Sequence, residues 1–167
     1  MKAVKKSMAC TIGVLVCGGM LLAQAAPKHP MDAGFTKPAP EAQKLLEETL
    51  AKHPEVIVMM MHVQPPNRSR NVVIASSMGR IGEIGDEDDM RCIRTDKSNL
   101  EINTAGNHFE DELTLKDRSG RIIGALGLVF NYTGGDDKTK LVAIAEQIRE
   151  ELREQIPSKA FLFTTVN

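Results

Sequence analysis

Two stretches of the chain place apolar residues with the period of an α-helix. Between residues 42 and 50 they recur at spacings of three and four, and Pro54 ends the stretch. The same spacing runs from Leu141 to Ile156, after a glycine pair and Asp136 that we expect to cap it. Such spacing gathers the apolar side chains on one helix face. The pattern therefore predicts two amphipathic helices, one near each end of a folded domain.

Between these helices the apolar residues follow the shorter period of β-strands. Five strands are expected, at 55–63, 71–76, 98–104, 109–116 and 121–132. Glycine-containing turns separate several of them, and Asp86 is suited to cap a short helix after the second strand. Residues 160–166 are expected to form either a short last strand or a docked tail. The order α-β-β-α-β-β-β-α predicts an α+β fold: a five-stranded antiparallel sheet flanked by N-terminal and C-terminal helices.

The first 25 residues have the composition of a signal peptide. Three lysines precede an uncharged apolar segment, 9–22, and Ala23-Gln24-Ala25 then offers the small residues that a signal peptidase reads. The apolar segment has about 14 residues, fewer than the ~20 that span a bilayer. We therefore expect cleavage after Ala25 and a periplasmic location.

Cleavage would leave a flexible proline-rich leader, 26–40, and a single domain, 41–167. Without the three lysines of the signal peptide, the chain holds 18 basic and 22 acidic residues, a net charge of about −4. This balance argues against nucleic acid as a partner, because phosphate neutralisation needs a concentrated basic face. Cys92 would be the remaining cysteine, and it is expected to be either buried and inert or paired between chains.

A run of glycines marks the strongest strand. Asp117-Arg-Ser-Gly120 is a turn, and Gly120, Gly124 and Gly127 follow the pattern G-x-x-x-G-x-x-G up to Phe130. Glycine inside a strand indicates a bend or a close approach by another group, and packing of the terminal helix is the alternative. This segment is similar to a late strand of single Cache domains, which are PAS-like extracytoplasmic sensors.

A second segment supports the same resemblance. Asn71 to Ser77, the glycine loop 79–82 and the acidic run 86–89 resemble the second strand and ligand-facing loop of those domains. The resemblance spans about residues 45–156 and implies that a small molecule binds between sheet and loop. Typical Cache receptors continue into a membrane helix and an output domain. Nothing after Ile156 is apolar enough for that, so we expect no transmembrane segment after cleavage, and a membrane or periplasmic protein partner.

Six polar residues are candidates for ligand contact. His62 ends the first strand on the same face as Met60. Arg80 lies in the glycine loop, where it would hold a carboxylate ligand, face solvent or pair with a nearby acid. The candidate set is His62, Arg80, Asn131, Tyr132, Ser76 and Ser77.

The sequence favours binding over catalysis. It has no G-x-S-x-G, P-loop or H-E-x-x-H motif, and Glu110, Asp111 and Glu112 are consecutive, so they alternate across a strand instead of converging. The leading hypothesis is a periplasmic Cache-like sensor protein without catalytic activity, cofactor or metal. One alternative is an interaction module with a filled pocket that docks on a membrane receptor. Another is a haem or copper binder through His62.

Overall fold

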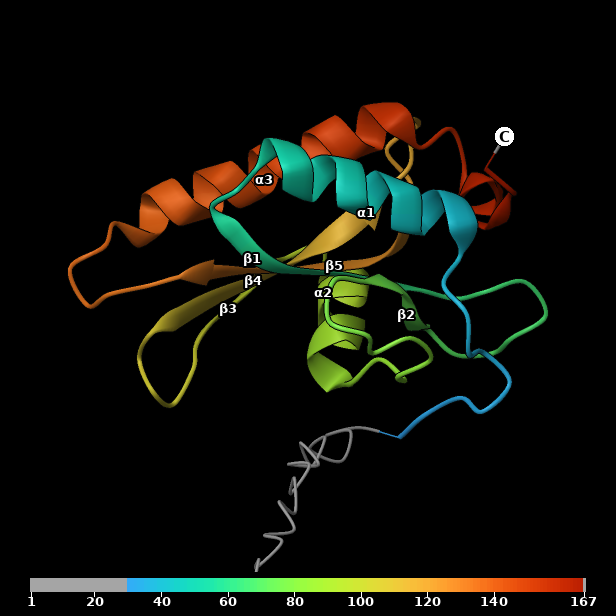
Figure 1. Cartoon of the computed structure of the whole chain (residues 1–167), viewed down its shortest axis with the longest axis horizontal. Coiled ribbons are helices and arrows are strands. Elements are labelled where there is room, and N and C mark those ends of the chain that lie inside the picture. The colour runs from blue at the N-terminus through green and yellow to red at the C-terminus, as the bar shows by residue number, and fades with distance from the viewer. Residues whose placement is uncertain (1–29, 167) are drawn as a thin grey trace, which may run out of the picture.

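The structure is a computed structural model that describes residues 30–166, so the expected signal peptide lies outside the described residues. Its elements follow the predicted order (Figure 1). They are helix α1 (Pro40–Lys52), strands β1 (Val56–Val63) and β2 (Val72–Ser76), helix α2 (Glu87–Thr95), strands β3 (Asn99–Ile102), β4 (His108–Lys116) and β5 (Ile122–Asn131), helix α3 (Lys138–Gln155) and the 3-10 helix η1 (Lys159–Phe163).

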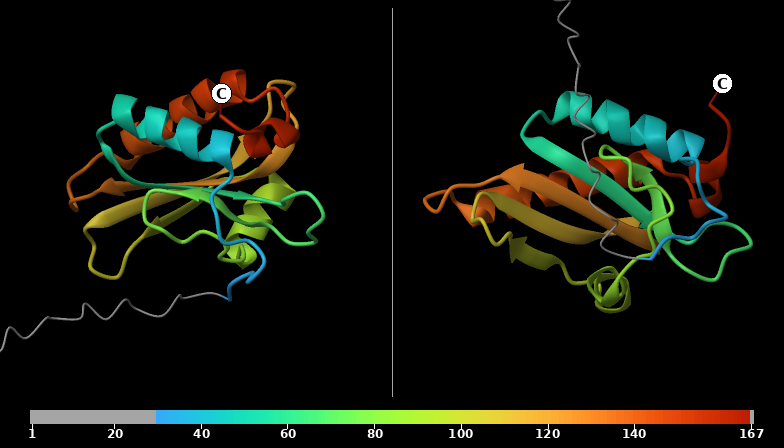
Figure 2. Two further views of the ribbon diagram at one scale, coloured as in Figure 1. Left: turned by 45° about the vertical axis from the view of Figure 1, so that its right-hand side comes forward. Right: turned by 60° about the horizontal axis from the view of Figure 1, so that its bottom comes forward.

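The five strands form one antiparallel sheet in the order β2-β1-β5-β4-β3. Strands β1 and β5 pair at its centre, with Met60 opposite Gly127 and His62 opposite Ala125. Helices α1 and α3 cover one face, and α2 lies on the other (Figures 1 and 2). The predicted α+β fold, with an antiparallel sheet flanked by the first and last helices, is therefore confirmed.

The main core lies between the sheet and helices α1 and α3. Strand alternation sends Met59 and Met61 into it, where both side chains are fully buried. Leu46 from α1 and Ile148 from α3 pack in the same cluster. Met60 and His62 therefore face the opposite side of the sheet, beneath α2. This face of the sheet is the one available for a site.

The start of α2 is fixed by a reciprocal cap. The Asp86 carboxylate accepts from the backbone N–H groups of Asp88 (2.9 Å) and Asp89 (3.2 Å), and the Asp89 carboxylate accepts from the Asp86 N–H (2.9 Å). Such a box satisfies donors that a helix leaves open. The prediction that these acids cap a helix is confirmed.

Three local expectations change. The described part of the leader, 30–39, is bound to the domain through Asp32 N–H to the Gly82 carbonyl (2.7 Å), and α1 already begins at Pro40. Asp137, one residue later than predicted, caps α3. The last segment is the helix η1 with a fully buried Leu162, so it is a docked tail and not a strand.

In residues 30–166, no helix is both long and apolar enough to cross a membrane.

The two glycines inside β5 have different environments. A Cβ added to Gly124 would lie 2.2 Å from the backbone oxygen of His62, so only glycine allows β1 to approach this closely. A Cβ on Gly127 would lie 3.8 Å from Oε1 of Glu110 and 3.9 Å from Cε of Met60, which is ordinary contact distance. The close-approach prediction holds at Gly124, whereas a Cβ at Gly127 would make only ordinary contacts.

Candidate functional site

A cavity of about 270 Å³ lies beneath α2 on the face of the sheet opposite the main core. The sheet forms its floor, and α2 with the loop that precedes it forms its walls. Its lining is dominated by carboxylates, with two basic side chains among them. The residues are Met60, His62, Arg80, Glu83, Ile84, Asp86, Asp88, Asp89, Glu101, Glu110, Glu112 and Gly127.

Strand alternation explains two of these acids. Glu110 and Glu112 are two residues apart in β4, so both point into the cavity, while Asp111 between them points to the other face. Glu101 of β3 lies opposite Glu110 in the strand register and adds a third carboxylate to the cavity. The prediction that consecutive acids do not converge is wrong for Glu110 and Glu112. Their i, i+2 spacing was the sequence signal for a shared face.

The enclosed acids hold their protons more tightly than exposed ones. Burial raises the pKa of Glu112 to about 8, and the charges of Asp89 and Glu110 add to the shift. Burial also raises the pKa of Glu110, reinforced by Glu101 and opposed by Arg80. A positive ligand would reverse these shifts, because it favours the ionised carboxylates. Binding of a positively charged ligand in this cavity would therefore release protons from Glu110 and Glu112.

Arg80 enters the cavity wall already paired. Its guanidinium donates through Nε and Nη2 to the two carboxylate oxygens of Glu83, whose side chain is 2% exposed. This hydrogen bond and charge raise the pKa of Arg80, although burial opposes the rise. Of the three alternatives for Arg80, the structure shows pairing with a nearby acid. The guanidinium supports the loop more directly than it offers a site for an anion.

His62 connects the sheet to α2. Its Nδ1 lies 2.9 Å from Oδ2 of Asp89, within ion-pair distance but not aligned as a hydrogen bond. No cluster of three or more His, Cys, Asp or Glu in the described part of the chain is placed to hold a metal ion. The carboxylate lining would also repel the anionic propionates of haem. The geometry thus gives little support to a metal or haem site at His62.

The remaining candidates lie outside this cavity. Tyr132 packs in the main core, with its ring centroid 6.2 Å from that of Phe109. Asn131 is exposed at the end of β5. Ser76 Oγ accepts from the Met78 N–H, and Ser77 Oγ accepts from the Met59 N–H (both 3.1 Å). The expected single pocket for all six residues is therefore corrected, because only His62 and Arg80 are brought together.

Cys92 is enclosed between α2 and the sheet. Its side chain is 1% exposed, and its thiol donates to the Glu112 carbonyl at 3.4 Å. Burial, with the nearby Glu112 and Asp111 charges, raises the pKa of the thiol to about 12. A thiol that is buried and protonated is unreactive. This environment matches the buried and inert alternative better than a disulfide between chains.

No protein-family model and no curated protein matches the chain significantly. Solved structures resemble its fold. The GAF domain of A. aeolicus nlh2 in an inactive state is 12% identical, with a TM-score of 0.51 over 68% of this chain and 80% of that one. The Agobacterium tumefaciens repressor BlcR is 11% identical, with a TM-score of 0.50 over 70% and 67%. The chain therefore has a GAF-like fold, and the Cache type stays a prediction.

Proposed function

We propose that this chain is an exported, Cache-like sensor protein that binds a small molecule in the cavity beneath α2 and acts through a protein partner. The observation that supports this most directly is the cavity itself, a polar hollow of about 270 Å³ on one face of a sensor-type sheet. Sites for small molecules are concave, with a few placed polar groups. A filled sheet face, which the interaction-module alternative expects, is not what this face presents.

The lining favours a ligand that is positively charged. Seven carboxylates surround the space, and the one guanidinium among them is already paired with Glu83. A small anion would meet a repulsive field, whereas an amine would find charge-assisted acceptors on β3 and β4. The ligand class proposed is thus a compact amine, with Glu110 and Glu112 as its principal acceptors. The carboxylate ligand that Arg80 suggested in the sequence is the weaker option.

A thermal-shift panel with the mature chain tests binding. The probes are putrescine, spermidine, sodium succinate and adenine. Putrescine at 100 times its dissociation constant should stabilise the protein by about 2.7 kcal/mol. Succinate should give no shift. Failure of every probe class to change the melting temperature would contradict the proposal, and a shift with succinate alone would reverse the proposed ligand charge.

A matched pair of variants locates the binding. Glu112→Gln removes one cavity carboxylate and should weaken the putrescine shift, since the amine loses an acceptor. Glu48→Gln removes an exposed carboxylate of α1, outside the cavity, and should leave the shift unchanged. Equal effects of the two variants would place the amine elsewhere on the surface.

Cell fractionation with N-terminal sequencing tests export, for which the expected first residue is Ala26.

A further inference from the structure

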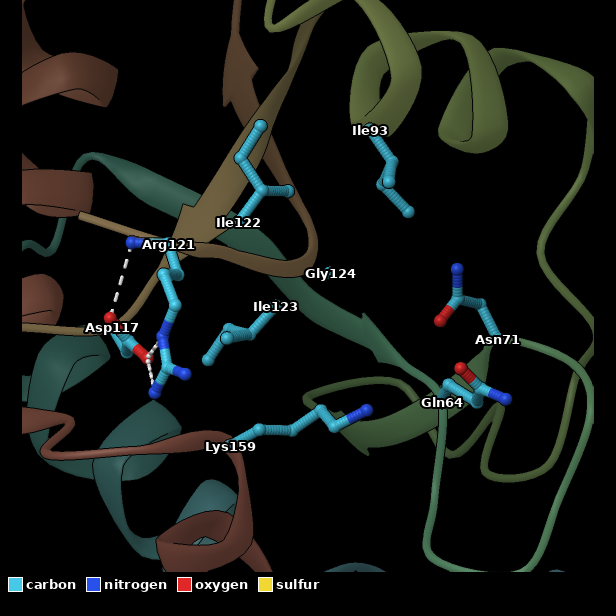
Figure 3. A pocket seen from close by; sticks show the side chains of 9 residues that line it. All are labelled: Gln64, Asn71, Ile93, Asp117, Arg121, Ile122, Ile123, Gly124 and Lys159. Carbon is cyan, nitrogen blue, oxygen red and sulfur yellow. Dashed lines mark hydrogen bonds and ion pairs between the residues drawn. The ribbon is translucent and has the colours of Figure 1, made fainter. Parts of the chain in front are cut away.

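A second cavity, of about 320 Å³, lies at the end of the sheet where β5 begins (Figure 3). It shares no lining residue with the acidic cavity. Its apolar wall comes from Ile93 of α2 with Ile122 and Ile123 of β5. Ile122 is 36% exposed, and Ile93 and Ile123 are partly exposed beside it. This cavity therefore offers accessible apolar surface.

The Arg121 side chain of this cavity is held in place by Asp117. The Asp117 carboxylate is fully buried, and its Oδ2 accepts from Nε (3.0 Å) and lies 2.9 Å from Nη2 of Arg121. Burial opposes ionisation of Asp117, but bonds from Ser119 and Arg121 together lower its pKa. The Arg121 side chain is 73% exposed, so its remaining N–H groups are open. The pair is a fixed and neutral unit with donors on its outer side.

A second basic side chain of the cavity has no partner among residues 30–166. Lys159 begins η1, and in Figure 3 its ammonium extends into the space between Ile123 and Gln64. It makes no ion pair or hydrogen bond with any residue in the part of the chain that the structure describes. Because Arg121 already neutralises Asp117, the ammonium leaves the cavity with a net charge of about +1. This sign is opposite to that of the cavity beneath α2.

We propose that this cavity binds a small carboxylate with an apolar body. Its carboxylate would lie between the Lys159 ammonium and the outer N–H groups of Arg121, where charge-assisted hydrogen bonds form. Its hydrocarbon part would cover the three isoleucines, which removes their exposed surface from water. This ligand differs in charge from the amine proposed above, and it binds in a different cavity. One chain would thus respond to two classes of molecule.

The test follows the isoleucine methyl groups of the mature protein by NMR. Sodium hexanoate is added to about 10 mM, which would nearly fill a site with a dissociation constant of about 1 mM. We expect saturating shifts at Ile93, Ile122 and Ile123. Sodium acetate, which lacks the apolar body, should bind more weakly. Hexylammonium, which has the opposite charge, should leave these three methyl groups unchanged.

Two lysine variants separate this site from general charge effects. Lys159→Gln should weaken hexanoate at least about threefold, because it removes the unpaired ammonium. Lys140→Gln removes an exposed α3 lysine outside the cavity and should bind as the wild type does. Unchanged methyl spectra in the absence of ligand would show that both variants fold. Absence of saturation at Ile93, Ile122 and Ile123, or equal binding by the two variants, would overturn the proposal without affecting the amine site.

Discussion

Nδ1 of His62 in β1 lies 2.9 Å from Oδ2 of Asp89 in α2. The same carboxylate accepts from the Asp86 N–H as part of the helix cap. One side chain thus fixes the first turn of α2 and ties that turn to the centre of the sheet. The wall of the acidic cavity and the stability of the domain therefore depend on the same residue.

Asp89→Ala is expected to destabilise the protein by about 1–2 kcal/mol, because the cap and the His62 contact are lost together. Asp88→Ala is the matched control one residue away. Its side chain is 41% exposed and pairs with Arg91, so its loss should cost less than about 0.5 kcal/mol. Urea unfolding measures both values. Equal costs for the two variants would show that Asp89 does not join helix to sheet.

The glycines of β5 allow a comparison within one strand. Gly127→Ala should be neutral or stabilising by up to about 1 kcal/mol, because alanine loses less backbone entropy and its Cβ meets only ordinary contacts. Gly124→Ala should cost about 1–3 kcal/mol, because its Cβ would overlap the His62 carbonyl. Thermal unfolding measures both. A tolerated Gly124→Ala would contradict the close approach of β1 and β5.

The sequence predicted the elements better than the site. Apolar periodicity located the five strands and helices α1 and α3, most of which bury a face against a common core. Helix α2 was indicated by its cap, and η1 was not predicted. Periodicity also placed His62 on the face opposite Met61. It could not show which face α2 would leave hollow, since that depends on how the helix docks. Glu83 was missed for this reason, because its burial follows from the path of an irregular loop.

Tyr132 illustrates a different limit. Tyr132 ends the predicted strand 121–132 and was a candidate for ligand contact, but the end of a strand does not by itself show which face its last residue takes. Counting by two from Leu126 and Leu128 places Tyr132 on the helix-covered face, where it packs against Phe109. Alternation alone therefore contained the answer once the core face of β5 was fixed.

Cys92 is expected to be unreactive in the folded protein. Its thiol is enclosed, and burial raises its pKa to about 12, so the reactive thiolate is scarce. A thiol reagent such as DTNB should label it slowly in buffer and rapidly in denaturing urea. A non-reducing gel should show no covalent dimer. Fast labelling of the native protein, or a disulfide-linked dimer, would favour pairing between chains instead.

Amine binding beneath α2 should strengthen as pH rises from about 6 to 8.5. Burial raises the pKa of Glu112 to about 8, so an amine must displace its proton in this range. Release of one proton changes affinity by up to about tenfold per pH unit. Calorimetry with putrescine in two buffers of different ionisation enthalpy counts the protons released. Glu112→Gln should flatten the dependence and Glu48→Gln should preserve it. A wild-type affinity that does not change with pH would refute this coupling.

Asp111 should make the protein less stable at neutral pH than in mild acid. Its carboxylate is fully enclosed beneath α3, and neither oxygen accepts a hydrogen bond. Burial raises its pKa from the usual 3.8 to about 7. Ser98 lowers the pKa of Asp111, although its contact is not aligned as a hydrogen bond. The charge of Glu146 raises this pKa further, and that of Arg149 lowers it.

The raised pKa fixes the direction of the pH effect. The folded state holds this proton to higher pH than the unfolded state, so the stabilisation is complete below about pH 4 and is lost as pH approaches 7. Asp111→Asn keeps the shape without the charge. At pH 8 it should exceed the wild type by about 1–3 kcal/mol, because a neutral amide is buried at lower cost than an ionised carboxylate without a partner. At pH 4.5 the two proteins should unfold at similar urea concentrations. A wild type that equals Asp111→Asn at pH 8 would show that α3 accommodates the charged carboxylate.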